Sequence, residues 1–228
     1  MGPWQTDDDT GPDNAGGAAL TEAETGNRER VARRQVDKFA ERRDELATAA
    51  LQTLAERGYA NTSLRDIAQH SAFSHGVLHY YFADKFELIS YCVRRYKAEC
   101  VTRYDTAVAT AATAEELLTE VGAAMAATLR ADASMHRLWY DLRNQALFEE
   151  SFRPDSTDID LSLERMIWRI VHRYADLAGF DVAVTPALAY ALMDGVFQHA
   201  LLRHLGGDAT AADDLDAHVR RLLPSFLA

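Results

Sequence analysis

The stretch Thr62–Leu88, TSLRDIAQHSAFSHGVLHYYFADKFEL, decides the fold of this 228-residue chain because it contains three places where a helix can begin. Three cap positions, Thr62 or Ser63, then Ser74 and then Asp84, are each followed by apolar residues at helical spacing. Their side chains can accept hydrogen bonds from the free N–H groups of a first turn. An acidic residue three positions after Ser63 and after Asp84 predicts a capping box at both. Residues 71–73 leave room only for a tight turn between the first two helices.

Longer helices flank these two short ones. The segment that starts at Asp44 repeats apolar residues at helical spacing and stops at Gly58, a residue type that often ends a helix. The helix that opens at Asp84 continues to about Tyr104. Two short helices joined by about three residues and braced on both sides are typical of a helix-turn-helix unit, whose second helix enters the major groove of DNA. The sequence therefore predicts such a unit here.

The composition is that of a helical protein. Hydrophobic residues make up 48% of the chain, and there are only five prolines. No apolar run approaches the length of a membrane span and no secretory signal is recognisable, so we expect a cytoplasmic protein without a membrane partner. The two cysteines, Cys92 and Cys100, are eight residues apart on one predicted helix and cannot bridge each other there.

The net charge of −11 is unevenly distributed along the chain. Residues 1–27 carry six acidic residues and no basic ones, and their Gly-, Asp- and Thr-rich composition predicts a disordered tail. Residues 28–97 carry thirteen basic and nine acidic residues, whereas residues 98–228 carry eleven and twenty. A polyanion would therefore be attracted to the segment that holds the helix-turn-helix unit. The basic stretch 27–43 either frays or extends the first helix.

The remainder of the chain predicts further helices, at about 114–130, 134–150, 160–178, 186–205 and 212–223. The expected fold class is therefore all-α, with an N-terminal three-helix helix-turn-helix DNA-binding domain and a C-terminal helical ligand-binding and dimerisation domain. The predicted divisions are an acidic tail at 1–27, the DNA-binding domain at 28–90 and the C-terminal domain at 91–228.

Residues 42–97 resemble the N-terminal domain of the TetR/AcrR family of bacterial transcriptional regulators. The shared features are a Gly-Tyr and Thr-Ser approach, an Ile-Ala pair in the second helix, a Ser-x-Gly opening of the recognition helix, an aromatic cluster and a lysine at the start of the fourth helix. The matching positions are Gly58, Tyr59, Thr62, Ser63, Ile67, Ala68, Ser74, Gly76, Leu78, Tyr80, Tyr81, Phe82, Lys85 and Leu88. The Met-Asp-Gly at 193–195 is a further, less specific likeness.

The chain departs from this family pattern at three positions. Ala72 stands where the family usually has the turn glycine, and a left-handed backbone at an alanine would cost about 1 kcal/mol unless the turn differs. His79 replaces the usual first aromatic residue, and Phe86 replaces the usual Glu after the lysine. These changes affect the choice of DNA sequence more than the fold.

The predicted DNA contacts surround the start of the recognition helix. Free N–H groups of a first turn suit a phosphate, and two histidines four residues apart lie on one helix face. The ten candidates are Thr62, Ser63, Arg65, Ser74, His75, Gly76, His79, Tyr80, Tyr81 and Lys85. Three alternatives stay open: the histidines form a zinc pair, although no third ligand stands at the expected spacing; Ser74 serves only as a helix cap; and Tyr81 belongs to the core.

Two predicted helices, 160–178 and 186–205, carry more apolar residues than packing within one subunit requires, which indicates a homodimer built from a four-helix bundle. The interface candidates are Leu163, Ile167, Ile170, Tyr174, Leu188, Leu192, Val196, His199 and Leu202. Two recognition helices about 34 Å apart would then read a palindromic site.

The family resemblance implies a ligand cavity inside the C-terminal domain, where binding moves the fourth helix and changes the separation of the two recognition helices. The lining candidates are Met125, Leu129, Trp139, Tyr140, Arg143, Asn144, Phe148, Met166, Trp168, Tyr190, Met193 and Phe197. They describe a mostly apolar pocket with a few polar anchors. For each of them the alternative is plain core packing, and Arg143 and Asn144 can equally face solvent.

Taken together, these features predict a homodimeric transcriptional repressor that binds a double-stranded DNA operator and leaves it when a small, largely hydrophobic effector binds. No catalytic, metal or cofactor motif is recognisable in the chain. Two other readings stay open. One is a helical small-molecule-binding or enzymatic protein that keeps the N-terminal unit as a scaffold, and the other is an activator or nucleoid-type binder without an inducer.

Overall fold

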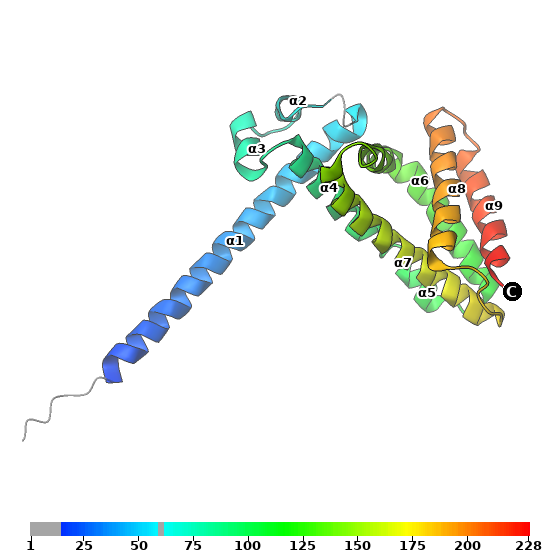
Figure 1. The fold of residues 1–228 in the computed structure, drawn as a ribbon, viewed down its shortest axis with the longest axis horizontal. Helices are drawn as coiled ribbons and strands as arrows, with labels where there is room; N and C mark the ends of the chain where they lie inside the picture. The colour runs from blue at the N-terminus through cyan, green and yellow to red at the C-terminus, as the bar shows by residue number, and fades with distance from the viewer. Residues whose placement is uncertain (1–14, 59–61) are drawn as a thin grey trace, which may run out of the picture. The chain divides into compact units, whose positions relative to one another are not determined.

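The computed structural model describes residues 15–58 and 62–228, and it confirms the all-α prediction (Figure 1). Over these residues the only β pairing is an isolated bridge between Val182 and Leu227. The helices are α1 (Ala15–Arg57), α2 (Leu64–Gln69), α3 (His75–Tyr81), α4 (Lys85–Cys100), α5 (Asp105–Thr110), α6 (Ala114–Gln145), α7 (Arg153–Ala178), α8 (Pro186–Leu205) and α9 (Ala211–Leu222), with short 3-10 turns at Glu150–Phe152 and Leu223–Phe226.

The chain divides into two compact units, residues 1–45 and 46–228. The described part of the first unit is the N-terminal part of α1. Helix there corrects the prediction of a disordered tail for residues 15–27, because alanine and glutamate are frequent in this stretch and favour helix. Residues 1–14 of that predicted tail, and Tyr59 of the family pattern, lie outside the described residues. The basic stretch 27–43 extends the helix.

The caps predicted for the helix-turn-helix unit are present. The Ser63 side chain accepts a hydrogen bond from the N–H of Asp66, whose carboxylate accepts in return from the N–H of Ser63 at 2.8 Å. Ser74 caps α3 by accepting from the N–H of Val77, and Asp84 caps α4 by accepting from the N–H of Glu87. In place of the reciprocal bond of the predicted capping box, the Glu87 carboxylate accepts from the N–H of Ala83 at 2.8 Å. The turn at Ala72 needs no left-handed residue, because the only positive φ angles in the described chain are at glycines. The expected cost at this position is therefore absent.

Fully buried apolar side chains hold the helix-turn-helix unit together. Ile67 of α2, Leu78 of α3 and Leu88 of α4 belong to one cluster with Leu46 and Leu54 from the C-terminal part of α1. Burial of a leucine or isoleucine side chain contributes about 1.5–3 kcal/mol. Because α3 buries only Leu78 completely, most of its surface stays available for other contacts.

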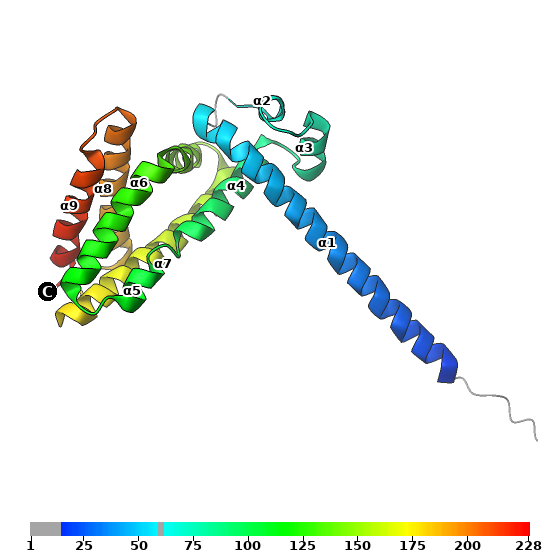
Figure 2. The same ribbon diagram turned by 180° about the vertical axis from the view of Figure 1, so that it is seen from behind.

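The C-terminal helices form a bundle. Helices α8 and α9 lie alongside α6 in both views, and α6 and α9 have the most extensive packing (Figures 1 and 2). At Gly122 of α6 the two backbones approach so closely that a Cβ atom would overlap the Asp216 carboxylate of α9. Where two helices were predicted at 114–130 and 134–150, α6 is one helix with a kink at Asp132, whose φ and ψ are −121° and 22°.

Two further boundaries differ from the sequence prediction. Helix α5 was not predicted, and α7 begins at Arg153 instead of at residue 160. Pro154 lies in the first turn of α7, where its missing N–H costs nothing and its fixed φ suits a helix. The predicted division between residues 90 and 91 falls inside α4, which is one continuous helix.

Candidate DNA interface and ligand cavity

The outer face of α3 presents ring side chains to solvent. His75 and His79 are exposed, and their rings pack edge to face with centroids 4.4 Å apart. Tyr80 is 73% exposed and contacts the half-buried ring of Tyr81 at 4.9 Å. The inner face of the same helix carries the buried Leu78. The structure therefore separates the packing face of α3 from a face rich in imidazole and phenol groups.

An open groove of about 330 Å³ runs between the starts of α2, α3 and α4. It brings together six of the ten predicted DNA contacts, and its lining residues are Thr62, Ser63, Leu64, Arg65, His75, His79, Asp84 and Lys85. Ser74, Gly76, Tyr80 and Tyr81 lie on α3 or at its cap, outside this lining. A groove with basic side chains from two helices beside an exposed recognition helix can hold phosphate oxygens.

Several of the predicted contacts, among them Thr62, Ser63 and Ser74, already make hydrogen bonds within the chain. The Thr62 side chain is buried and donates a hydrogen bond to the carbonyl of Gly58 at 2.8 Å, which argues against its predicted phosphate contact. The Ser74 hydroxyl accepts a hydrogen bond from the N–H of Val77 at 3.3 Å, so it serves as the cap of α3. Gly76 is exposed, and a Cβ there would meet only the Ser74 hydroxyl, at 4.0 Å. Among the described residues no group of three His, Cys, Asp or Glu side chains could hold a metal ion.

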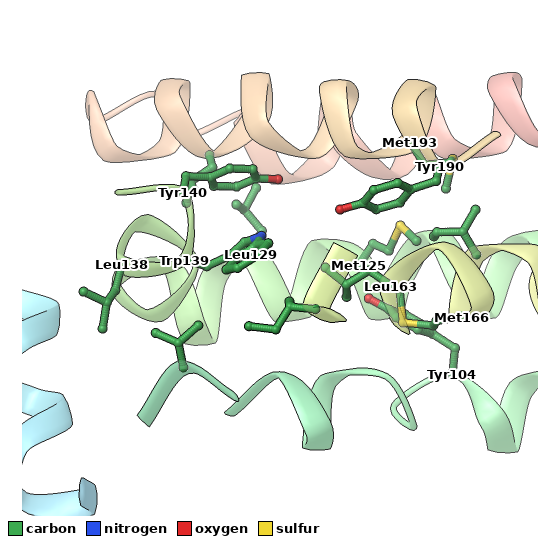
Figure 3. Packing of buried hydrophobic residues seen from close by; sticks show 14 of the residues in the cluster. Tyr104, Met125, Leu129, Leu138, Trp139, Tyr140, Leu163, Met166, Tyr190 and Met193 are labelled. Atoms are coloured by element: carbon green, nitrogen blue, oxygen red, sulfur yellow. The ribbon is translucent and has the colours of Figure 1, made fainter. Parts of the chain in front are cut away.

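A cavity of about 70 Å³ lies between α4, α6, α7 and α8. Seven of the twelve predicted ligand residues line it: Met125, Trp139, Tyr140, Met166, Tyr190, Met193 and Phe197. Figure 3 shows the packing of these helices, with the rings of Tyr140 and Tyr190 beside α8. Apolar and aromatic side chains dominate the walls.

The other five predicted ligand residues lie elsewhere. Leu129 is fully buried in the core, and Arg143 stands outside the lining. Asn144 and Phe148 are exposed, Phe148 by 82%, because they lie in and after the last turn of α6. Trp168 is half-buried and packs edge to face against His172. These five positions are corrections to the predicted pocket.

Several polar residues of the cavity were not predicted. Lys97 and Cys100 reach it from α4, Arg103 follows α4, and His136 comes from α6. The sequence signal for them was weak, because α4 was interpreted through its role in the helix-turn-helix unit. A lysine on a helix face surrounded by cysteine and tyrosine residues was the one available clue.

Lys97, His136 and Tyr96 form a buried hydrogen-bonded chain. The Lys97 Nζ lies 3.3 Å from Nδ1 of His136, whose Nε2 lies 3.1 Å from the Tyr96 hydroxyl oxygen. Because an ammonium group can only donate, Nδ1 accepts, and Nε2 therefore carries the proton and donates to Tyr96. Burial lowers the pKa of Lys97 to about 8, and burial together with the nearby Lys97 and Arg103 lowers the pKa of His136 to about 2. At neutral pH Lys97 is charged and His136 is neutral.

A second polar cluster closes the α8 side of the cavity. Asp194 accepts from the Tyr140 hydroxyl at 2.8 Å and from Arg143, and Asp160 accepts from the Tyr190 hydroxyl and pairs with Arg143 at 3.2 Å. Burial and the adjacent aspartates raise the pKa of both tyrosines, so both hydroxyl groups stay protonated as donors. Arg143 therefore joins α6 to α7 and α8 and does not line the cavity itself.

The predicted interface residues of α7 are buried, whereas those of α8 lie at the surface. Leu163, Ile167, Ile170 and Tyr174 of α7 are buried inside the protomer, and Leu163 and Ile167 line the cavity, which corrects their assignment to a dimer surface. The residues of α8 lie at the surface: Leu188, Leu192 and Leu202 are 48%, 41% and 65% exposed, His199 is exposed and Val196 is half-buried. An open groove beside them includes Gly195 and residues of α9. No helix in the described part of the chain could cross a membrane.

The fold and these sites define a helix-turn-helix protein with a separate internal cavity. A family model described as "Bacterial regulatory proteins, tetR family" matches residues 46–92. The HTH-type transcriptional repressor KstR2 of Mycolicibacterium smegmatis is 26% identical over 149 residues, which are 54% of this chain and 72% of that protein. The family match over residues 46–92 and the similarity to KstR2 support a TetR-family transcriptional regulator.

Two solved structures illustrate the shared fold. The regulator FadR of Bacillus subtilis, in complex with stearoyl-CoA, has a TM-score of 0.65 and 18% sequence identity, and the match covers 78% of this chain and 95% of FadR. A transcriptional regulator of Saccharomonospora viridis, in complex with choline, has a TM-score of 0.68 and 18% identity, with 82% and 98% of the two chains covered. At this level of identity the likeness concerns the fold.

Proposed function

We propose that this TetR-family regulator is a homodimeric repressor that binds a palindromic operator through α3 and leaves it when a largely hydrophobic molecule enters the internal cavity. The observation that carries the proposal is α4, because one helix connects the two sites. Lys85 at its start lines the groove beside α3, and Lys97 and Cys100 at its end line the cavity. At 1.5 Å per residue, Lys85 and Lys97 are about 18 Å apart along the helix.

The DNA contacts follow from the exposed face of α3. His79 and His75 are in position to donate to or accept from base edges in a major groove, while Arg65 and Lys85 supply positive charge for the flanking phosphates. The Ser74 cap fixes the start of the helix, and Gly76 allows the sugar-phosphate backbone to approach. The segment 28–97 is the positively charged part of the chain, which favours this face for a polyanion.

The release mechanism follows from the size of the cavity. Sites for drug-sized ligands measure roughly 300–1,000 Å³, so a cavity of about 70 Å³ must expand when such a ligand enters. Since α4 forms one wall, expansion displaces the helix whose other end supports α3. In a dimer this displacement changes the distance between the two recognition helices and shifts the population away from the DNA-competent state.

The proposed dimer contact is the exposed apolar face of α8. Leu192 of this face also lines the open groove toward α9, and clusters of exposed apolar residues of this kind mark interaction surfaces. A two-fold axis at this face would pair α8 and α9 with the same helices of a partner.

KstR2 is named a repressor and FadR was solved with stearoyl-CoA, and both support a repressor with a hydrophobic effector. We place this activity in the cytoplasm, and we propose no enzymatic reaction.

The test is a mobility-shift titration with the DNA upstream of the gene and unrelated DNA of equal length. We expect a shift specific to one palindromic fragment, with an affinity that falls as salt rises. His79→Ala should weaken the specific complex roughly tenfold or more, because a good base contact contributes about 1–3 kcal/mol. His172→Ala, which changes an exposed histidine of α7, is the matched control and should leave the affinity unchanged. Equal binding to specific and unrelated DNA would contradict the proposal.

A further inference from the structure

We infer that the effector carries an anionic group, in the simplest case a carboxylate, which pairs with the ammonium group of Lys97 inside the cavity. This inference rests on the proposed role of the cavity as the effector site and adds the chemical class of the molecule. Its apolar part would lie against Met125, Leu163, Met166, Ile167, Met193 and Phe197. The effector would thus be an amphipathic acid.

Lys97 is a buried charge without a counter-ion in contact. Its side chain is 3% exposed, and no carboxylate of the described residues lies within 4.0 Å of its Nζ. Its Nζ lies against the neutral imidazole of His136 and the faces of two aromatic rings, 5.6 Å from the centroid of Tyr96 and 5.4 Å from that of Trp139. The Cys100 thiol, whose pKa is raised by burial, also interacts with it electrostatically. A buried ammonium is costly unless an anion pairs with it, so this arrangement is stabilised by an incoming anion.

Two residues of the cavity, Lys97 and Trp139, carry hydrogen-bond donors that are not used within the described chain. An ammonium group has three donors, and His136 accepts only one of them. The indole N–H of Trp139, which also lines the cavity, is buried with no hydrogen-bond partner in the described part of the chain. Two oxygen atoms of one carboxylate could accept from both residues, and such charge-assisted bonds are about twice as strong as neutral ones.

The acidic residues nearby are engaged with other groups. Asp194 and Asp160 each accept from a tyrosine hydroxyl and pair with the single guanidinium of Arg143. The two aspartates and Arg143 together carry a net charge of −1. At longer range this negative charge helps Lys97 to stay protonated. Arg103 is likewise paired with Asp132 at 2.6 Å. Lys97 is therefore the cation of the cavity that an anionic effector can reach without breaking a salt bridge in the described chain.

A cationic effector is the main competing class. The S. viridis regulator was solved with choline, and the aromatic rings of the present cavity could face a quaternary ammonium group. Lys97 and Arg103 would repel such a cation at the same cavity. The observations therefore favour the acid, and an amine enters the experiment as the opposing probe.

The experiment uses the full-length protein and three series of straight-chain probes with four to twelve carbons: n-alkanoates, n-alkanols and n-alkylamines, each below its micelle concentration. Calorimetric titration and thermal unfolding at pH 7 should show that an alkanoate binds more tightly than the alkanol of equal length. Lys97→Met should weaken alkanoate binding roughly tenfold to a hundredfold and leave alkanol binding unchanged. Lys38→Met, at an exposed lysine of α1, is the matched control and should bind as the wild type does.

A second measurement covers the case in which Lys97→Met does not fold. At pH 9 the Lys97 side chain of the free protein is mostly deprotonated, so a bound carboxylate should draw one proton onto it. Titrations of the wild-type protein in buffers of different ionisation enthalpy should report this uptake for alkanoates and none for alkanols.

Equal affinity for acids and alcohols, preference for amines, or no acid binding across the series would overturn the inference. The outcome is separable from that of the DNA experiment. Specific DNA binding without acid binding contradicts the inference alone. Lys97-dependent acid binding without specific DNA binding contradicts the proposed function alone.

Discussion

Lys97 and His136 lie in contact inside the cavity, and burial makes each of them bind fewer protons in the folded chain than in the unfolded chain. The pKa of Lys97 falls from 10.5 to about 8, and that of His136 from 6.5 to about 2. At a pH between the folded-state and the unfolded-state pKa of such a group, the unfolded chain binds its proton and the folded chain does not. The free energy of unfolding therefore increases with pH across that interval. Each residue therefore predicts a pH dependence in a different range.

Lys97→Met should remove the alkaline part of this dependence. Between pH 8 and 10.5 the free energy of unfolding of the wild type should rise relative to that of the variant, by up to about 3 kcal/mol, because the buried ammonium loses its charge in the folded state first. Urea unfolding at pH 7.5, 9 and 10 measures the difference. Parallel pH profiles of the two proteins would contradict the burial of a charged Lys97. Lys38→Met should run parallel to the wild type.

Some functional residues could be predicted from the sequence and others could not. Ser74, His75 and His79 could be recognised because cap chemistry and helical spacing are local properties. Lys97 and His136 could not, because they are 39 positions apart and only the packing of α4 against α6 brings them together. Periodicity likewise places Leu163 on the apolar face of its helix. It does not tell whether that face packs against the core of the protomer or against a second copy of the chain.

At the scale of elements, helix starts were predicted most accurately where a side chain caps the first turn. The starts of α2, α3 and α4 were predicted because Ser63, Ser74 and Asp84 all engage the N–H groups of the first turn. A break between two helices was predicted where α6 has its kink at Asp132, and the structure has one continuous element there. The first turns of α7 were missed because they are polar, although Pro154 marked their start.

The close approach of α6 and α9 gives a prediction for a pair of residues. Gly122→Ala should lower the free energy of unfolding by about 1–2 kcal/mol, because the new methyl group displaces the Asp216 carboxylate from its 2.8 Å contact with Arg220. In an Asp216→Ala background the same change should become stabilising by about 1 kcal/mol, as alanine favours helix over glycine. Denaturant unfolding of the four proteins forms a double-mutant cycle. Additive effects would contradict the close contact.

At the scale of the whole molecule, exposed apolar side chains gather on α8, while the charge of the chain is negative outside residues 28–97. The all-α architecture and the likeness of residues 46–92 to the TetR family could be predicted from the sequence, because the helix-turn-helix stretch is both local and specific. Which apolar residues of α7 and α8 face the protomer and which face outward could not be predicted, because apolar residues cover most faces of α8 and periodicity does not show which face packs inside.

The dimer prediction belongs to this scale. Leu202→Glu places a charge on the most exposed leucine of α8 and should raise the dimer dissociation constant tenfold or more, since a desolvated charge opposes burial of an apolar interface. Sedimentation at several protein concentrations measures the dimer fraction, and operator binding should weaken in parallel. Leu147→Glu, at a leucine after α6 that is 72% exposed, is the control and should do neither. A Leu202→Glu protein that stays dimeric would show that copies associate elsewhere.

The continuity of α4 restricts how this chain can change length during evolution. One residue inserted between Lys85 and Lys97 would turn one end of the helix by about 100° relative to the other and lengthen it by about 1.5 Å, so either the groove or the cavity would lose its lysine. The exposed turn at residues 147–149, after the end of α6, fixes no such phase relation between two sites. Insertions and deletions in natural variants of this protein should therefore accumulate in turns of that kind and be purged from α4.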